Sequence, residues 1–137
     1  MTVDKLEDST NDPFASLYTY QYALLKTFRK SGDPVPTPIW FANENGKLYI
    51  TTANTAGKVK RIRNNGRVML TPCDQRGRLI EGAKEVEGVA HELVASEYAH
   101  ANAVLLRKYK LMYRMFDVIG FLSRRKSTYI EVVAAGA

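Results

Sequence analysis

Short stretches in which apolar and polar residues alternate recur along the chain, and clusters of turn-forming residues separate them. A period of two is typical of strands that bury one face. In the first stretch, Tyr18, Tyr20, Tyr22 and Leu24 alternate with smaller or polar residues. The pattern predicts strands over residues 18–24, 37–42, 48–52, 67–73, 86–94 and 128–133. Turn residues at 31–34 and 43–46, the latter with an Asn-Gly pair, predict that the first three strands form an antiparallel meander.

Helix signals lie between these strands. Asp12 before Pro13 is typical of an N-cap followed by proline at the first helical position, and predicts a short helix through Leu17. A basic helix is predicted from Ala56, with Gly66 placed to end it. The clearest helix covers residues 96–111, and a further helical piece covers 113–122. The predicted N-cap of the helix at 96–111 is Ser96, and the predicted apolar face of this helix consists of Ala99, Ala103, Leu106 and Leu111.

Because short strands dominate and helices are interspersed, we expect a mainly β (α+β) fold, a small antiparallel barrel of six or seven strands with a few helices. Residues 1–12 include four acids and few apolar anchors, so they are predicted to be a flexible tail. Residues 13–137 then form one domain. No internal repeat is evident.

Composition narrows the function classes. The 137 residues, 45% hydrophobic and 25% charged, suit one globular domain. The most apolar stretch, residues 116–122, is interrupted by Asp117 and Gly120, so no membrane span is expected. The acidic amino terminus does not resemble a secretory signal, and the single cysteine, Cys73, cannot form an internal disulfide or a cysteine-based metal site. We therefore expect a cytoplasmic protein with no metal.

The net charge of +6 is concentrated in one segment. Five basic residues and no acid lie between residues 58 and 67, directly after a threonine-rich strand end and Gly57. Hydroxyls, a glycine and a lysine at a helix amino terminus favour a phosphate or carboxylate ligand. A solvated helix face explains the same residues about equally well. A Walker P-loop is excluded, because it needs glycine at the position of Thr52 and Ser or Thr at the position of Val59.

Three segments carry a family resemblance: residues 31–41 (SGDPVPTPIWF), 48–52 (LYITT) and 56–68 (AGKVKRIRNNGRV). Together they resemble the split β-barrel flavin and deazaflavin proteins related to pyridoxamine 5′-phosphate oxidase. The similarity is greatest to the actinobacterial branch that uses the deazaflavin coenzyme F420. It extends from residue 13 to 133 and is most specific over residues 36–73.

The resemblance implies a homodimer with the cofactor at the subunit interface. The ring would be bordered by Thr37, Pro38, Ile39 and Trp40, largely through backbone groups. The phosphate would be surrounded by Thr51, Thr52, Ala56, Gly57 and Lys58, with Arg61 nearby. The oxidase pattern has Ser-Arg-Lys where this chain has Ala56, Gly57 and Lys58, so the lysine is kept and the arginine is absent.

That absence disfavours a terminal flavin phosphate, which benefits from a bidentate arginine. F420 carries an internal phosphodiester and an oligoglutamate tail, which suit the spread of single charges at Lys60, Arg61, Arg63 and Arg67. The resemblance thus implies an F420-dependent oxidoreductase that transfers a hydride to a small, conjugated, electron-poor acceptor, with FMN as the alternative cofactor. A non-catalytic F420, flavin or haem carrier or sensor, and an FMN-dependent oxidase, are the alternative functions. Nucleic-acid binding is not expected, because the basic run contains no stacking aromatic residue.

A few other residues have the chemistry to be functional. His91 and His100 have no metal or triad spacing, so a structural or surface role is favoured for both. Cys73 is interpreted as packing, and Trp40 as core or pocket lining with equal weight. An aromatic and basic cluster is interpreted first as an interhelical connection, and otherwise as a part that closes the partner subunit's site. It consists of Arg107, Lys108, Tyr109, Lys110, Tyr113 and Arg114.

Overall fold

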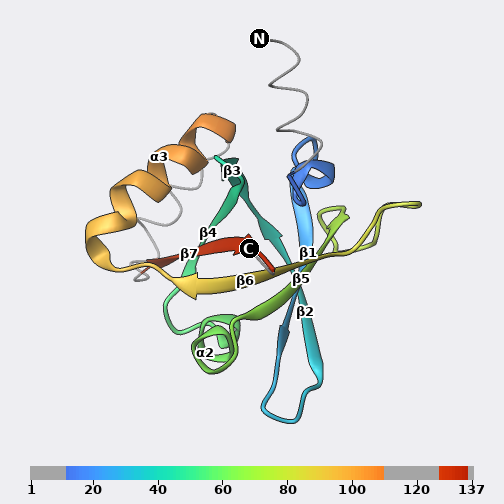
Figure 1. Ribbon diagram of the computed structural model, residues 1–137, viewed down its shortest axis with the longest axis horizontal. Coiled ribbons are helices and arrows are strands. Elements are labelled where there is room, and N and C mark those ends of the chain that lie inside the picture. Colours follow the sequence, from blue (N-terminus) through green and yellow to red (C-terminus); the bar gives the residue numbers. More distant parts are fainter. Residues whose placement is uncertain (1–11, 110–126, 136–137) are drawn as a thin grey trace.

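The structure is a computed structural model that describes residues 12–109 and 127–135. Its core is one sheet of seven strands, with α2 at one end and α3 along one side (Figure 1). The strands are β1 (Tyr22–Phe28), β2 (Pro34–Trp40), β3 (Ala42–Glu44), β4 (Lys47–Ala53), β5 (Arg67–Cys73), β6 (Val86–Glu92) and β7 (Ser127–Ala134). The helices are the 3-10 turns η1 (Ala15–Leu17) and η2 (Ala95–Glu97), and the α-helices α2 (Gly57–Asn64) and α3 (Tyr98–Lys108).

All strand pairs are antiparallel, in the order β2-β1-β5-β6-β7-β4-β3, and the sheet curls into a half-barrel. The expected antiparallel barrel is therefore confirmed. The expected meander is wrong, because β2 and β3 lie at opposite ends of this order. Only Phe41 separates them, and one residue is too few for a hairpin loop. The hairpins that form are β1–β2 and β3–β4.

Two apolar clusters stabilise the fold. The larger one fills the concave side of the sheet, where Phe14 and Leu17 of the η1 region pack against strand residues such as Leu25 and Ile130. The smaller one lies between α3 and β3–β4. There α3 buries Ala101, Val104 and Leu105, and not the predicted face of Ala99, Ala103 and Leu106. With about 3.6 residues per turn, the predicted positions lie on nearly the opposite side of the helix. The sequence provided no clear guide to the buried side, because a helix of many alanines shows only a weak apolar stripe.

The first strand begins at Tyr22, later than predicted, and buries Ala23, Leu25 and Thr27 while Tyr22 and Leu24 stay partly exposed. Tyr18, one of the tyrosines that suggested an earlier start, has a different role, since its hydroxyl donates to the Asp12 carboxylate. Asp12 Oδ1 also accepts the Phe14 N–H at 2.9 Å. The predicted N-cap is nevertheless wrong, because Phe14 occupies the N-cap position of η1 and the helical segment is a single 3-10 turn.

Other boundaries agree closely with the sequence patterns. β5 has the predicted limits, and Asn45 and Gly46 form the β3–β4 turn with φ of 51° and 76°. α2 ends at Asn64, so Gly66 lies beyond its end. Gly66 is required for another reason, because a Cβ there would lie 2.6 Å from the Ala90 carbonyl oxygen of β6. The start of α3 is preceded by η2, and Glu97 rather than Ser96 occupies the N-cap position.

The predicted helical piece at 113–122 and the tail at 1–11 lie outside the described residues. Within the described part of the chain, no helix has the length and apolar character needed to cross a membrane.

Candidate functional site

The corner between β4 and α2 is built from the residues that the sequence singled out. Thr51 and Thr52 lie near the end of β4, both partly buried, and the Thr51 hydroxyl donates to the Thr128 carbonyl of β7 at 3.2 Å. Ala56 is the N-cap of α2, and its methyl side chain cannot accept a hydrogen bond. The Val59 N–H donates to the Ala56 carbonyl at 3.1 Å. Among the described residues, the Gly57 and Lys58 N–H groups therefore remain available to an external acceptor.

The basic residues of this region separate into two groups. Arg63 pairs with Glu92 of β6 at 2.8 Å, and Arg67 pairs with Glu87 at 3.3 Å. Lys58 and Arg61 have no carboxylate within 4.0 Å among residues 12–109 and 127–135. Two of the charges assigned to binding an oligoglutamate tail, those of Arg63 and Arg67, are thus already neutralised by the chain's own acids.

The side chains of Lys58 and Arg61 lie close together, because the Arg61 guanidinium extends back to the start of α2. The Arg61 Nε donates to the buried Thr27 hydroxyl of β1 at 2.6 Å, and its guanidinium lies against Gly57, where a Cβ would be 2.8 Å from Nη1. Burial lowers the pKa of Lys58, and neighbouring Arg61 lowers it further. Burial and then the charge of Arg29 lower the pKa of Arg61.

These three cations, Lys58, Arg61 and Arg29, are called the cation cluster below. Arg29 directly follows β1 in the turn to β2, and Figure 1 shows this turn at the same end of the sheet as α2. Sequence reasoning missed Arg29, because only the β1–β2 hairpin brings it to α2. Uncompensated like charges repel, so an anion bound among them would be strongly favoured.

The predicted ring strand, β2, is an edge strand that pairs with β1 alone among the described residues. Pro34, Pro36 and Pro38 stand at alternate positions and have no N–H to donate. Because successive residues of a strand point their N–H groups to opposite sides, these prolines face the open edge. This edge therefore offers mainly carbonyl acceptors, and the N–H groups of Thr37 and Ile39 face β1.

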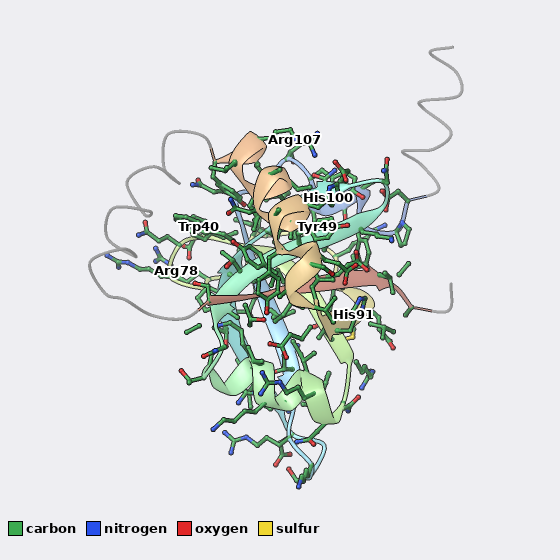
Figure 2. All side chains as sticks on the ribbon, turned by 90° about the vertical axis from the view of Figure 1, so that its left-hand side faces the viewer. Trp40, Tyr49, Arg78, His91, His100 and Arg107 are labelled. Atoms are coloured by element: carbon green, nitrogen blue, oxygen red, sulfur yellow. The ribbon has the colours of Figure 1, made fainter. Side chains whose placement is uncertain are left out.

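The anion side and the ring side of the predicted site lie apart. Arg61 contacts Thr27, which is opposite Val35 in the β1–β2 register. Trp40 is five residues further along β2, so about 16 Å separates the two ends at 3.3 Å per residue. Figure 2 accordingly shows Trp40 well above α2. One small group cannot contact both ends, but an elongated cofactor can.

Trp40 itself is partly buried within its own chain. Its indole stacks on Tyr109, with ring centroids 5.2 Å apart and planes at 16°. The Tyr109 hydroxyl accepts the Phe41 N–H at 3.1 Å, and its proton can be donated to the Phe41 carbonyl or to the Gln21 carbonyl at 2.8 Å. Lys108 donates to the Tyr20 carbonyl at 2.8 Å. Tyr109 and Lys108 thus anchor α3 to its own barrel, and closure of a partner's site by this cluster stays a prediction. Lys110, Tyr113 and Arg114 lie outside the described residues.

The remaining candidates have surface or packing roles, as expected. His91 and His100 are exposed and pair with Glu131 at 3.2 Å and Glu44 at 2.5 Å, on the α3 side of the molecule and away from α2 (Figure 2). Cys73 is buried, and burial raises the pKa of its thiol. Within the described residues no group of three or more His, Cys, Asp or Glu side chains is arranged to hold a metal ion.

Several solved structures share this fold. A protein of unknown function from Agrobacterium tumefaciens is 19% identical with a TM-score of 0.66, and the match covers 96% of this chain and 55% of that one. A proposed pyridoxamine 5′-phosphate oxidase from Listeria innocua is 15% identical with a TM-score of 0.59, covering 98% and 94% of the two chains. An FAD-binding protein from Mesorhizobium loti is 13% identical with a TM-score of 0.62, covering 98% and 88%.

No protein-family model and no curated protein sequence matches the chain. At identities below 25% the structural matches establish the fold, which is the split barrel of pyridoxamine 5′-phosphate oxidase-like proteins. The chain spans about half the length of the Agrobacterium protein and nearly all of the Listeria one. A shared fold does not determine function, which depends on the residues of the site.

Proposed function

We propose that this chain binds a flavin-type cofactor with its anionic group at the cation cluster and its ring along β2. The observation that carries the proposal is a pair of partly buried cations, Lys58 and Arg61, that have no carboxylate partner among the described residues. They lie at the uncapped start of α2, which the Arg61 guanidinium reaches at Gly57. Burying cations without a counter-ion is unfavourable, so such a pair is expected where a ligand supplies the charge. The shared fold with an FAD-binding protein and a proposed pyridoxamine 5′-phosphate oxidase supports the same assignment.

The deazaflavin F420 is the cofactor we favour, with FMN as the alternative. Arg63 and Arg67 are neutralised, but Arg29 adds a charge that the sequence did not indicate, and Lys60 remains exposed on α2. Single cations spread from α2 to the β1–β2 turn suit an extended anion with several separate charges. A terminal phosphate would benefit from one bidentate arginine, and Arg61 already uses its Nε on Thr27.

The protein's own contribution would be binding and orientation. When bound, F420 supplies the hydride chemistry. The open edge of β2, with its carbonyl acceptors and the partly buried Trp40, would orient the ring, while the cation cluster would fix the anionic end. One chain leaves this edge uncovered among its described residues. We therefore propose a homodimer in which the partner covers the cofactor, and a small, conjugated, electron-poor acceptor as the substrate.

Titration with F420, FMN, FAD and haem, followed by fluorescence or absorbance, tests the binding. We expect saturable F420 binding that is tighter than FMN binding, and light scattering that reports a dimer. Saturable binding of haem alone would contradict the proposal. Oxidation of bound, reduced F420 by a panel of nitro, quinone and enone acceptors then separates an oxidoreductase from a carrier, since a carrier would turn over none of them.

A further inference from the structure

We propose that Glu92 is a positioning residue for the corner between β4 and α2, where the anionic group of the cofactor would bind. It holds α2, the helix side of this corner, at a fixed separation from the end of β4, the strand side. This inference rests on the proposed function, because it concerns the same corner. Glu92 is the last residue of β6, outside both α2 and β4, and its side chain is 21% exposed. Among the described residues it contacts Arg63, one of the cations that the sequence assigned to the cofactor's tail, and Thr128, which the sequence did not assign.

One carboxylate connects the two sides. Its Oε1 accepts from Arg63 Nε of α2 at 2.8 Å, and its Oε2 accepts from Arg63 Nη2 at 3.1 Å. The same Oε2 accepts from the buried Thr128 hydroxyl of β7 at 2.6 Å. These bonds to Arg63 and Thr128 lower the pKa of Glu92, so it is ionised at neutral pH. A bidentate arginine contact also fixes direction, which a single contact does not.

Thr128 continues the connection into the strand side of the corner. It lies opposite Thr52 in the β4–β7 register, and its carbonyl accepts the Thr51 hydroxyl at 3.2 Å. Its own hydroxyl proton is used on Glu92, so the 3.0 Å contact with Tyr98 is donated by the Tyr98 hydroxyl of α3. Through Arg63, Glu92 thus connects α2 to Thr128 of β7, the neighbour of Thr52 in the β4–β7 pair, and the Tyr98 bond to Thr128 adds α3 to this connection.

Positioning and simple electrostatics predict opposite effects when this carboxylate is neutralised. Glu92 is a negative charge near a site for an anion, so its removal should tighten anion binding if charge alone matters. Removing the Glu92 charge would also free the Arg63 guanidinium, which adds a second reason for tighter anion binding. If Glu92 instead sets the separation of α2 from β4, its removal should weaken binding, because the N–H groups of α2 and the cations would lose their fixed geometry.

Glu92→Gln removes the charge, and Thr128→Val breaks the second contact without changing any charge. Glu87→Gln is the matched control, because Glu87 is also on β6 and also pairs with an arginine, Arg67, but has no contact with Thr128. Dissociation constants would be measured for F420 and for the deazaflavin without its phosphodiester and tail. Thermal unfolding would confirm that each variant is folded.

We expect Glu92→Gln and Thr128→Val to weaken F420 binding by at least about fivefold, the effect of losing one hydrogen-bonded contact. Both should leave the tail-free deazaflavin unaffected, which a general loss of stability would not do. Glu87→Gln should bind F420 as the wild type does or more tightly. Unchanged or tighter F420 binding by Glu92→Gln would overturn the positioning role alone. Equal wild-type affinity for the two ligands would contradict the proposed function, and the positioning role with it.

Discussion

Lys108 is a partly buried cation whose removal should change how stability depends on pH. Its Nζ lies 3.7 Å from the centroid of the Phe41 ring and donates to the Tyr20 carbonyl at 2.8 Å. No carboxylate among the described residues pairs with it. Burial lowers the pKa of Lys108 from 10.5 to about 8. Lys108→Met keeps the apolar stem against Phe41 and removes the buried charge.

The direction of this pH dependence follows from the number of protons that the folded and unfolded chains bind. Between pH 8 and 10.5 the unfolded chain keeps this proton while the folded chain releases it, so the free energy of unfolding rises with pH. At 1.36 kcal/mol for each pKa unit, the gain between pH 7 and pH 9.5 is about 2 kcal/mol at most. Solvent reaches part of this side chain and screens its charge, which reduces the expected gain to about 1 kcal/mol.

Urea unfolding followed by the fluorescence of Trp40, the single tryptophan, provides the assay. We expect the wild type to gain about 1 kcal/mol relative to Lys108→Met between pH 7 and pH 9.5. Lys84→Met removes the same charge at an exposed position and should keep the wild-type dependence. A wild type and Lys108→Met with parallel pH profiles would refute the reasoning, because the Lys108 ammonium would then be as well solvated in the folded state as in the unfolded state.

Three further predictions concern stability and reactivity. Tyr109→Phe removes the hydroxyl that bonds the Phe41 N–H and the Gln21 carbonyl, and should lower the free energy of urea unfolding by about 1–3 kcal/mol; a smaller loss would mean that water replaces the hydroxyl. Gly66→Ala places a Cβ 2.6 Å from the Ala90 carbonyl oxygen and should cost about 1–3 kcal/mol in the same assay, whereas wild-type stability would show that β6 can move. Cys73 is 3% exposed, so a thiol reagent should label it only upon unfolding; rapid labelling of the folded protein would contradict its packing role.

Local patterns in the sequence predicted most of the fold. Strand β5, the Asn45–Gly46 turn and the basic helix α2 each follow from signals within a few residues, and all are present. The pairing order of the strands could not be predicted in this way. The insertion of β7 between β6 and β4 depends on contacts between residues about 80 positions apart, such as the Tyr49 hydroxyl and Glu131, for which |i−j| is 82.

Some residues of the candidate site could likewise be predicted from local sequence, and others depend on contacts between distant segments. Lys58, Arg61 and the helix start are contiguous in sequence, so the spacing of charges and glycine indicated them. Arg29 could not be found, because its place beside Arg61 depends on the β1–β2 hairpin. Nor could the sequence separate free from neutralised cations. Lys58 and Arg63 are both basic residues of α2, but only the approach of β6 gives Arg63 its carboxylate, Glu92.

The affinity of Lys58→Ala for F420 tests most directly whether the cation cluster binds the cofactor. Lys58 is the best residue to change, because it makes no hydrogen bond or ion pair to other described residues, whereas Arg61 also holds Thr27. Losing one charge-assisted contact should weaken binding by about 1.5–3 kcal/mol, or roughly 10- to 150-fold. The exposed Lys84→Ala should bind as the wild type does. An unchanged dissociation constant for Lys58→Ala would place the anion elsewhere and contradict the account.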